Sequence, residues 1–290
     1  KTTLLNNIIL EIAQKYTSKE VELYLMDYRE GVEFQVFKNH PNCKKIFLDN
    51  EDLQAATNLL KDFVEIMKVR GKLFKQKEVP DIDTYNKLEK EEHIPRVILI
   101  IDEVHRLFAG SWGEKEKFAK LLEDIVRRGR GFGVHLILST QTLLGTDINS
   151  QTMAQIPLRI SYKLNTERDA EKIFGNGNTV PLQLKKYELV YNNNSGNKEA
   201  NVACRVNTPT DIKSIINEIR ITRDESLCLT PEIVKSELSD NVEEETSKTQ
   251  WKFDPIVNSK TKYDTSEEEA LLAEFAKQGI VPEIAKEISK

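Results

Sequence analysis

Long hydrophobic runs are absent from the sequence, and so is any pattern of a secretory signal. The aliphatic run at residues 97–101 is far shorter than the roughly 20 residues that a membrane-spanning helix needs. The first residues do not show the charged and then apolar segments of a signal peptide. We therefore expect a cytoplasmic location for these residues, with any membrane anchor lying outside them.

Cysteine is also scarce. Cys43, Cys204 and Cys228 are an odd number, lie far apart in the sequence and do not have the spacing of metal ligands. This pattern argues against a disulfide framework and against a zinc site. It indicates reduced thiols, as in a cytosolic protein.

A strong charge of one sign is missing from most of the chain. The net charge is −5, but residues 223–290 carry 16 acidic and 9 basic residues, whereas residues 1–222 carry 31 acidic and 33 basic ones. We expect a nearly neutral body followed by an acidic tail. This balance neither favours nor excludes nucleic acid as a partner, because a basic groove can lie within a neutral domain.

Strand and helix patterns alternate regularly along the chain. Apolar residues at helical spacing predict helices at residues 2–15, 50–70, 114–127 and 209–219. Asn50 has the position of an N-cap in the second of them. Runs of β-branched and aliphatic residues predict strands at residues 21–28, 44–49, 97–104, 134–141, 158–164, 187–193 and 202–206. This order predicts an α/β fold with a mostly parallel central sheet flanked by helices, and the last two strands are expected to form a hairpin.

The alternation breaks after residue 219. Residues 223–265 are largely polar and acidic, which predicts a linker or a loosely attached arm. Ser266 and Glu269 have the spacing of a capping box, and Gly279 follows as a stop signal. Residues 266–290 are therefore predicted to form short helices, which would either lie in solvent or dock on a neighbouring subunit.

The opening "KTTLLNN" has the residues that end a phosphate-binding loop, although no glycine precedes them here. Such a loop needs glycines for close backbone approach, a lysine for the outer phosphates and a hydroxyl group for magnesium. Lys1 would be the phosphate lysine and Thr2 the magnesium ligand, with Thr3 beside them at the nucleotide. The amino terminus of the following helix would face the phosphates. Many helices begin with threonine, so this interpretation depends on a second motif.

The second motif is "RVILIIDEVH", residues 96–105, an apolar strand that ends in two acids. A strand of this kind is buried on both faces, and its carboxyl end lies where open α/β sheets bind ligands. We expect Asp102 to bind the magnesium ion, directly or through water, and Glu103 to orient and deprotonate the attacking water. The alternative is a strand that merely exits into solvent through two acids.

A third motif, "LILSTQ", ends another buried strand in polar residues. A polar side chain at this position, beside the acidic strand, can sense the terminal phosphate through a hydrogen bond. We expect Gln141 to have this role. The alternative is an amide that only starts a loop.

Five pieces of the chain, taken in order, resemble the motor domain of FtsK/SpoIIIE-type translocases. They are "KTTLLNNII", "YLMDYREGVEF", "VILIIDEVHRLF", "RRGRGFGVHLILSTQT" and "IPLRISYKLNTERDAEKIFG". The spacer "MKVRGKLFKQKEVPDIDTYN" is also similar to the stretch before the acidic strand of that family. The resemblance implies a RecA-like P-loop ATPase domain at residues 1–222, whereas the tail after Arg223 resembles nothing in the family.

The resemblance also implies a ring, usually of six subunits, that hydrolyses ATP with Mg²⁺ and pulls a polymer through its centre. ATP would lie between subunits, where a neighbour supplies a cation to the developing charge. The candidates for this cation are Arg128, Arg130, Arg159 and Arg168. Arg130 and Arg159 align with arginines of the family, whereas Arg168 stands beside the aligned position. The sequence leaves this arginine unassigned, because the chain has Asp169 and Glu171 at the aligned position. A surface salt bridge is the alternative for each candidate.

The polymer is ambiguous within the family, since some members move double-stranded DNA and others drive protein export in type VII secretion. In the family, the regions that correspond to residues 68–77 and 142–151 approach the pore. The first is basic, and Lys72, Lys75 and Lys77 are predicted to contact DNA phosphates without reading the base sequence. A solvated helix face would contain the same residues.

Double-stranded DNA is the favoured polymer. Export motors usually carry several such domains in tandem behind a membrane segment, whereas one such domain is visible in this sequence. A type VII protein-export ATPase of the EssC kind is the first alternative. The second is an ATPase-fold scaffold that serves assembly and hydrolyses ATP weakly, although such a scaffold would not need Lys1, Asp102 and Glu103.

Overall fold

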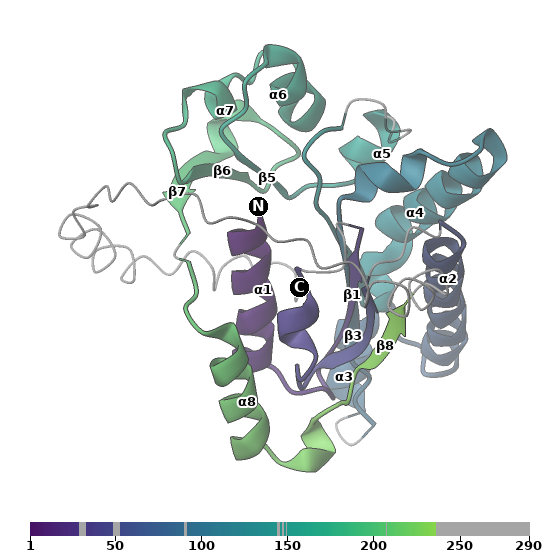
Figure 1. Cartoon of the computed structure of the whole chain (residues 1–290). Helices are drawn as coiled ribbons and strands as arrows, with labels where there is room; N and C mark the ends of the chain where they lie inside the picture. Colours follow the sequence, from purple (N-terminus) through teal and green to yellow (C-terminus); the bar gives the residue numbers. More distant parts are fainter. Residues whose placement is uncertain are drawn as a thin grey trace, which may run out of the picture.

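The computed structural model describes residues 1–28, 33–48, 53–89, 92–143, 146, 148, 150–206 and 208–235 of the 290 residues. These residues form two sheets, one of five strands and one of three, with helices around them (Figure 1). Within the described ranges, no helix is both long enough and apolar enough to cross a membrane.

The larger sheet is parallel throughout. Its strands are β1 (Val21–Asp27), β2 (Cys43–Leu48), β3 (Arg96–Asp102), β4 (Val134–Leu138) and β8 (Glu232–Lys235). They are arranged in the order β4-β3-β1-β2-β8. This topology confirms the predicted α/β fold with a mostly parallel central sheet.

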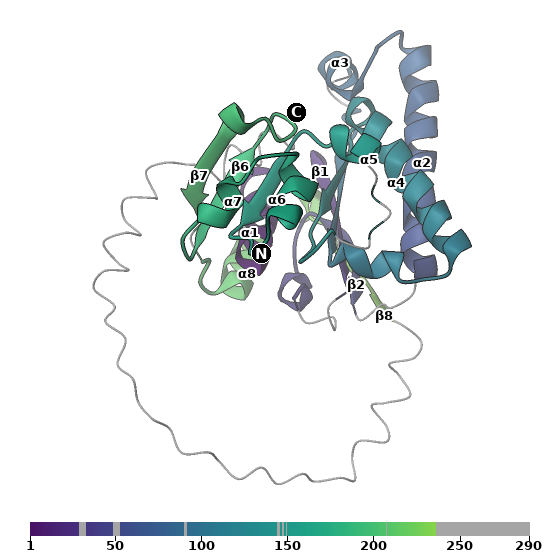
Figure 2. The same ribbon diagram turned by 90° about the horizontal axis from the view of Figure 1, so that it is seen from above.

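Helices cover both faces of the larger sheet because its central strands are apolar on both sides. Along β1, Leu23 and Leu25 join one core, whereas Tyr24 and Met26 join the other. The first core is covered by α1 (Thr2–Lys15) and α8 (Ile212–Thr222), and the second by α2 (Leu53–Gln76) and α4 (Trp112–Phe132). Figure 2 shows α2 and α4 together on one side of the sheet and α1 and α8 on the other. The shorter helix α3 (Ile82–Leu88) packs against the end of α2.

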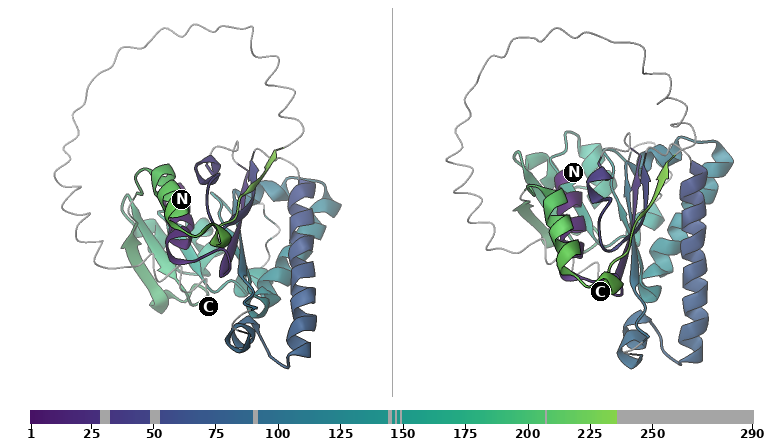
Figure 3. Two further views of the ribbon diagram at one scale, coloured as in Figure 1. Left: turned by 90° about the horizontal axis from the view of Figure 1, so that it is seen from below. Right: turned by 60° about the horizontal axis from the view of Figure 1, so that its bottom comes forward.

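The smaller sheet is antiparallel and lies beyond α1. It contains β5 (Arg159–Tyr162), β6 (Glu188–Asn192) and β7 (Asn201–Arg205), and the pairing of β6 with β7 confirms the predicted hairpin. Leu189 and Cys204 share a core with Ile9 of α1, so α1 lies between the two sheets (Figure 3). The other face packs through Val190 on α6 (Glu167–Phe174) and α7 (Val180–Gln183), whereas α5 (Ser150–Ala154) precedes β5.

Strand β8 was not expected, because its residues fall in the segment that the sequence assigns to an acidic arm. It pairs with β2, with Ile46 opposite Ile233. Arg223 also joins this segment to the body, since its guanidinium donates to the carbonyl oxygens of Ala13 and Tyr16 at 2.5 and 2.9 Å. The packed part of the chain therefore extends beyond residue 222, at least to Lys235. The remainder of the predicted arm, the predicted helices at residues 266–290 and the Asn50 cap lie outside the described residues.

Candidate nucleotide site at the carboxyl edge of the sheet

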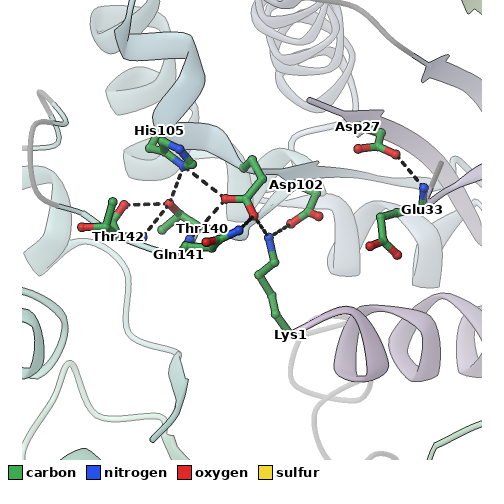
Figure 4. A network of polar contacts seen from close by, with 9 residues as sticks. Lys1, Asp27, Glu33, Asp102, His105, Thr140, Gln141 and Thr142 are labelled. Carbon is green, nitrogen blue, oxygen red and sulfur yellow. Dashed lines mark hydrogen bonds and ion pairs between the residues drawn. The ribbon is translucent and has the colours of Figure 1, made fainter. Parts of the chain in front are cut away.

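Four of the predicted site residues meet at one edge of the larger sheet, and Figure 4 labels three of them, Lys1, Asp102 and Gln141. Asp102 is the last residue of β3, Glu103 follows it, and Gln141 follows the end of β4. Lys1 comes from another element, since it lies at the start of α1. Because β3 and β4 are parallel neighbours, their carboxyl ends lie at the same edge, as the sequence predicted.

Lys1 connects the two acids. Its Nζ lies 2.8 Å from Oδ1 of Asp102 and also pairs with Oε1 of Glu103. Asp102 and Glu103 are each only 1% exposed. Two adjacent carboxylates at this depth are stable in the charged form only with a cation beside them, and Lys1 provides that cation.

A left-handed backbone conformation at Glu103 turns the chain sharply at the end of β3. Its φ and ψ are 56° and 46°, a region that costs a residue with a side chain about 1–3 kcal/mol. Backbone hydrogen bonds on both sides fix this turn against β4. The Ser139 N–H donates to the carbonyl of Ile101 at 2.9 Å, and the Val104 N–H donates to the carbonyl of Ser139 at 3.0 Å. The turns after β3 and β4 are therefore fixed side by side.

Each carboxylate oxygen of Glu103 faces two donors. Oε1 accepts from Lys1 and from Nε2 of Gln141 at 2.8 Å. Oε2 accepts from the Gln141 N–H at 3.2 Å and lies 3.2 Å from Nδ1 of His105. Burial raises the pKa of Glu103, but the hydrogen bonds from Lys1 and Gln141 outweigh burial, and the net pKa lies below its ordinary value. Glu103 is therefore ionised at neutral pH, as a proton acceptor must be.

The first turn of α1 suits an anion. It contains no acidic residue, and its N-cap, Lys1, makes no side-chain hydrogen bond to the helix. The first N–H groups of any helix lack partners within the helix, and here these include the N–H groups of Thr2 and Thr3. These N–H groups, the positive end of the helix dipole and the Lys1 ammonium group together favour the binding of phosphate.

The donor groups at this edge fit a magnesium ion that is bound together with a nucleotide. Asp102 offers a buried carboxylate, and Thr2 offers a hydroxyl group at the first position of α1. In the described part of the chain, no group of three or more His, Cys, Asp or Glu residues could bind a metal without other ligands. Mg²⁺ commonly uses one or two carboxylates, with phosphate oxygens and water completing its shell. Asp102 and Thr2 would contribute the protein ligands in such a shell.

The candidate trans arginines on α4 and α6 are exposed. Arg128 and Arg130 lie in the last turns of α4, at the opposite end of that helix from the nucleotide site. Arg128 forms a two-pronged pair with Asp124. In the described ranges, neither Arg130 nor Arg168 of α6 forms an ion pair. Arg130 is therefore exposed and remote from the residues at the carboxyl edge of the sheet.

Arg159 has different surroundings and is only 8% exposed. Its guanidinium donates to three main-chain carbonyl oxygens, those of Met153 at 2.6 Å, Ile173 at 2.9 Å and Ile156 at 3.1 Å. These bonds join the start of β5 to α5 and α6. A guanidinium that is already bonded to three carbonyls is not available to the nucleotide of a neighbour. These contacts argue against Arg159 as the trans cation, and we propose a structural role for it.

Replacing Arg159 by methionine should lower the free energy of unfolding by about 3 kcal/mol, because it leaves buried carbonyl oxygens without donors. Urea denaturation would show this as a lower midpoint with an unchanged slope. Arg168→Met, at an exposed position, is the matched control and should unfold like the wild type. If Arg159→Met has normal stability but no ATPase activity, Arg159 is the trans arginine after all.

The lysines predicted to contact DNA are exposed near the end of α2. Arg70 fixes this end at the amino-terminal edge of the sheet, because its guanidinium donates to the carbonyls of Pro95 and Phe132, which precede β3 and β4. Lys72, Lys75 and Lys77 follow, and Lys77 pairs with Glu89.

The described residues directly after β4, residues 139–143, lie at the other edge of the sheet. In Figure 1, α5, which follows this segment, is at the top, and α3, which follows the end of α2, is at the bottom. Lys72, Lys75 and Lys77 therefore lie toward the opposite edge of the sheet from the described residues that follow β4. Part of residues 142–151 lies outside the described residues.

Sequence reasoning did not single out three residues at the site. Asp27 ends β1 directly opposite Asp102, is fully buried and accepts a hydrogen bond from the Glu33 N–H at 2.9 Å. His105 and Thr140 contact each other beside Glu103. The signal for Asp27 was available, because it is an acid at the end of another apolar strand. No sequence signal placed His105 against Thr140.

A family model for FtsK/SpoIIIE matches residues 1–176, which include Lys1, Asp102, Glu103 and Gln141. The chain belongs to the FtsK/SpoIIIE family. This confirms the resemblance that was inferred from the five sequence pieces. The fold of this FtsK/SpoIIIE chain is that of a P-loop ATPase domain, and its structural relatives agree.

Two relatives and one solved structure are similar to this FtsK/SpoIIIE chain. It is 32% identical over 200 residues to the ESX secretion system protein EccC of Geobacillus thermodenitrificans, covering 67% of this chain and 13% of that protein. It is 26% identical over 220 residues to the DNA translocase FtsK of Caldanaerobacter subterraneus, covering 76% of this chain and 30% of that protein. The structure of EssC ATPases 2 and 3 from Geobacillus thermodenitrificans superposes with a TM-score of 0.66 at 17% identity, covering 81% of this chain and 44% of that one. The chain therefore spans less than a third of these two relatives.

Proposed function

We propose that this chain is the motor domain of an ATP-driven ring translocase. The observation that carries the proposal is the meeting of Lys1, Asp102, Glu103 and Gln141 at the carboxyl edge of β3 and β4, from three separate parts of the chain. A cation for phosphate, a buried carboxylate for magnesium, an ionised base and a phosphate-sensing amide are the parts that ATP hydrolysis requires. A scaffold that only assembles would have no use for them.

Each residue has one role in the proposed reaction. Lys1 binds the outer phosphates beside the amino terminus of α1, and Asp102 and Thr2 bind Mg²⁺, which neutralises charge on the phosphates. Glu103 orients the attacking water and accepts its proton, and Gln141 links Glu103 to the terminal phosphate. Arg130 of a neighbouring subunit supplies the cation for the developing charge. Because this arginine comes from a second subunit, the active form is a ring, usually of six subunits.

We propose double-stranded DNA as the polymer. The similarity to the DNA translocase FtsK covers 76% of this chain, and the exposed Lys72 and Lys75 are available for phosphate contacts. Protein export is the second candidate. One observation favours it, because the secretion protein EccC has the higher identity of the two relatives, 32% against 26%.

The two candidates differ in what stimulates ATP hydrolysis. Long duplex DNA should raise the ATPase rate, and salt should weaken its effect with a log–log slope of roughly −0.9 for each phosphate contact. The base sequence of the DNA should matter little, because contacts to phosphate position the protein without reading bases. Replacing Lys72, Lys75 and Lys77 together by alanine should preserve the basal rate and flatten the slope.

The matched control for this experiment replaces Lys115, Lys117 and Lys120 of α4 by alanine. It changes the net charge by the same amount at a different place and should retain the wild-type slope. An export motor would respond to a peptide signal and not to DNA. A ring-forming protein that duplex DNA does not stimulate at low salt would therefore favour export.

A further inference from the structure

We propose that His105 is a positioning residue for Glu103, and that it ties the orientation of this carboxylate to the turn after β4. The proposal rests on the proposed role of Glu103 as the general base. It adds a residue whose effect on the reaction passes entirely through Glu103.

One nitrogen of His105 makes both contacts. His105 lies in η2 (Val104–Phe108), directly after the left-handed turn at Glu103 (Figure 4). Its Nδ1 is 3.2 Å from Oε2 of Glu103 and 3.0 Å from Oγ1 of Thr140. Its side chain is 30% exposed, whereas that of Glu103 is 2% exposed. The imidazole thus covers the buried carboxylate from the solvent side and links it to Thr140.

The hydrogen bonds of Thr140 decide which atom carries the hydrogen. The Thr140 hydroxyl donates to the carbonyl oxygen of Thr142 at 2.7 Å and accepts from the N–H of Thr142 at 3.2 Å. Its single hydrogen is therefore directed away from His105, so Nδ1 of His105 is the donor. Oε2 of an ionised Glu103 can only accept. The Nδ1–H group thus lies between two acceptors, one on the base and one on the turn.

This arrangement fixes the carboxylate plane of Glu103. Without His105, the Gln141 N–H at 3.2 Å would be the one remaining donor to Oε2 among the described residues. The terminal torsion of a glutamate is broad, so fewer donors permit rotation away from the attacking water. At metal sites, loss of a hydrogen bond that orients a ligand costs about 10- to 100-fold in affinity or activity, and we expect a loss of this order here. The loss should fall on kcat and not on KM, because Lys1 and the start of α1 bind the nucleotide.

Two substitutions separate the donor from the bulk of the side chain. His105→Leu fills the space but has no N–H group, and we expect a fall in kcat of about 10- to 100-fold with KM unchanged. His105→Asn retains an N–H group near the position of Nδ1 and should restore most of kcat. In the turn after β4, Thr140→Val should also lower kcat, whereas Thr140→Ser, which retains the hydroxyl group, should leave kcat unchanged. Equal kcat values for His105→Leu and His105→Asn would overturn the proposal.

A double variant tests whether the effect passes through Glu103. In the Glu103→Gln background, His105→Leu should lower the residual rate no further, because coupled residues are not additive. An equal loss in both backgrounds would show that His105 acts elsewhere. If Glu103→Gln hydrolyses ATP at the wild-type rate, the proposed function itself fails, and this outcome is distinct from an additive loss at His105.

Discussion

Glu103→Gln should bind ATP like the wild type and lose most of its turnover, by about 10²–10⁴-fold. The glutamine retains the shape of Glu103 and can still accept a hydrogen bond from Lys1 or Gln141. It cannot take a proton from water, and the reaction then lacks its base. Lys1 and the amino terminus of α1 are unchanged, so affinity for the nucleotide should persist. The two quantities are measured separately, as the dissociation constant for ATP with Mg²⁺ and the steady-state rate of phosphate release.

Glu116→Gln is the matched control for this variant. Among the described residues, Glu116 pairs with Lys120 on the surface of α4, and such pairs contribute little. Its rate and affinity should equal those of the wild type. A Glu103→Gln protein with normal turnover would contradict the assignment of the base. A protein that no longer binds ATP would show that Glu103 acts in binding and not in the chemical step.

Arg130→Ala should also abolish most hydrolysis, by about 10³-fold or more, because the charge that forms on the transferred phosphoryl group loses its cation. The defect should nevertheless be repaired by mixing. A subunit with Arg130→Ala retains its Glu103, and a subunit with Glu103→Gln retains its Arg130. When the two form one ring, some interfaces combine the intact halves. In a random equal mixture, roughly a quarter of the head-to-tail interfaces should be complete.

The expected result is a mixture that hydrolyses ATP far faster than either variant alone. Arg128→Ala, which removes the neighbouring arginine that pairs with Asp124, should be nearly as active as the wild type and serves as the control. A mixture no faster than the mean of its components would contradict Arg130 in trans. Repeating the mixing with Arg168→Ala would then show whether Arg168 supplies the cation.

The central cluster could be predicted from the sequence because strand ends are predictable. Asp102 and Gln141 each follow an apolar run, and parallel neighbours bring such ends to one edge of the sheet. Lys1 could be included in this cluster because it directly precedes an amphipathic helix, as the lysine of a phosphate-binding loop does. In the structure, Lys1 and Gln141 contact Glu103, and Lys1 also pairs with Asp102.

Arg159, β8 and His105 could not be placed in the same way. The partners of Arg159 are main-chain carbonyls, which leave no mark in the sequence. The four residues of β8 are too few to show a period, and their pairing with β2 is set by the approach of distant segments. The contact of His105 depends on a left-handed turn at Glu103, which a residue with a side chain seldom adopts.

Displacement of a third strand from duplex DNA tests the proposed function most directly. A short triplex-forming oligonucleotide is bound near one end of a long duplex, and its release is followed after addition of protein, ATP and Mg²⁺. We expect release that requires ATP hydrolysis, is lost with Glu103→Gln and becomes slower as the distance from the entry end increases. A protein that forms rings and hydrolyses ATP but leaves the third strand in place would contradict movement along double-stranded DNA.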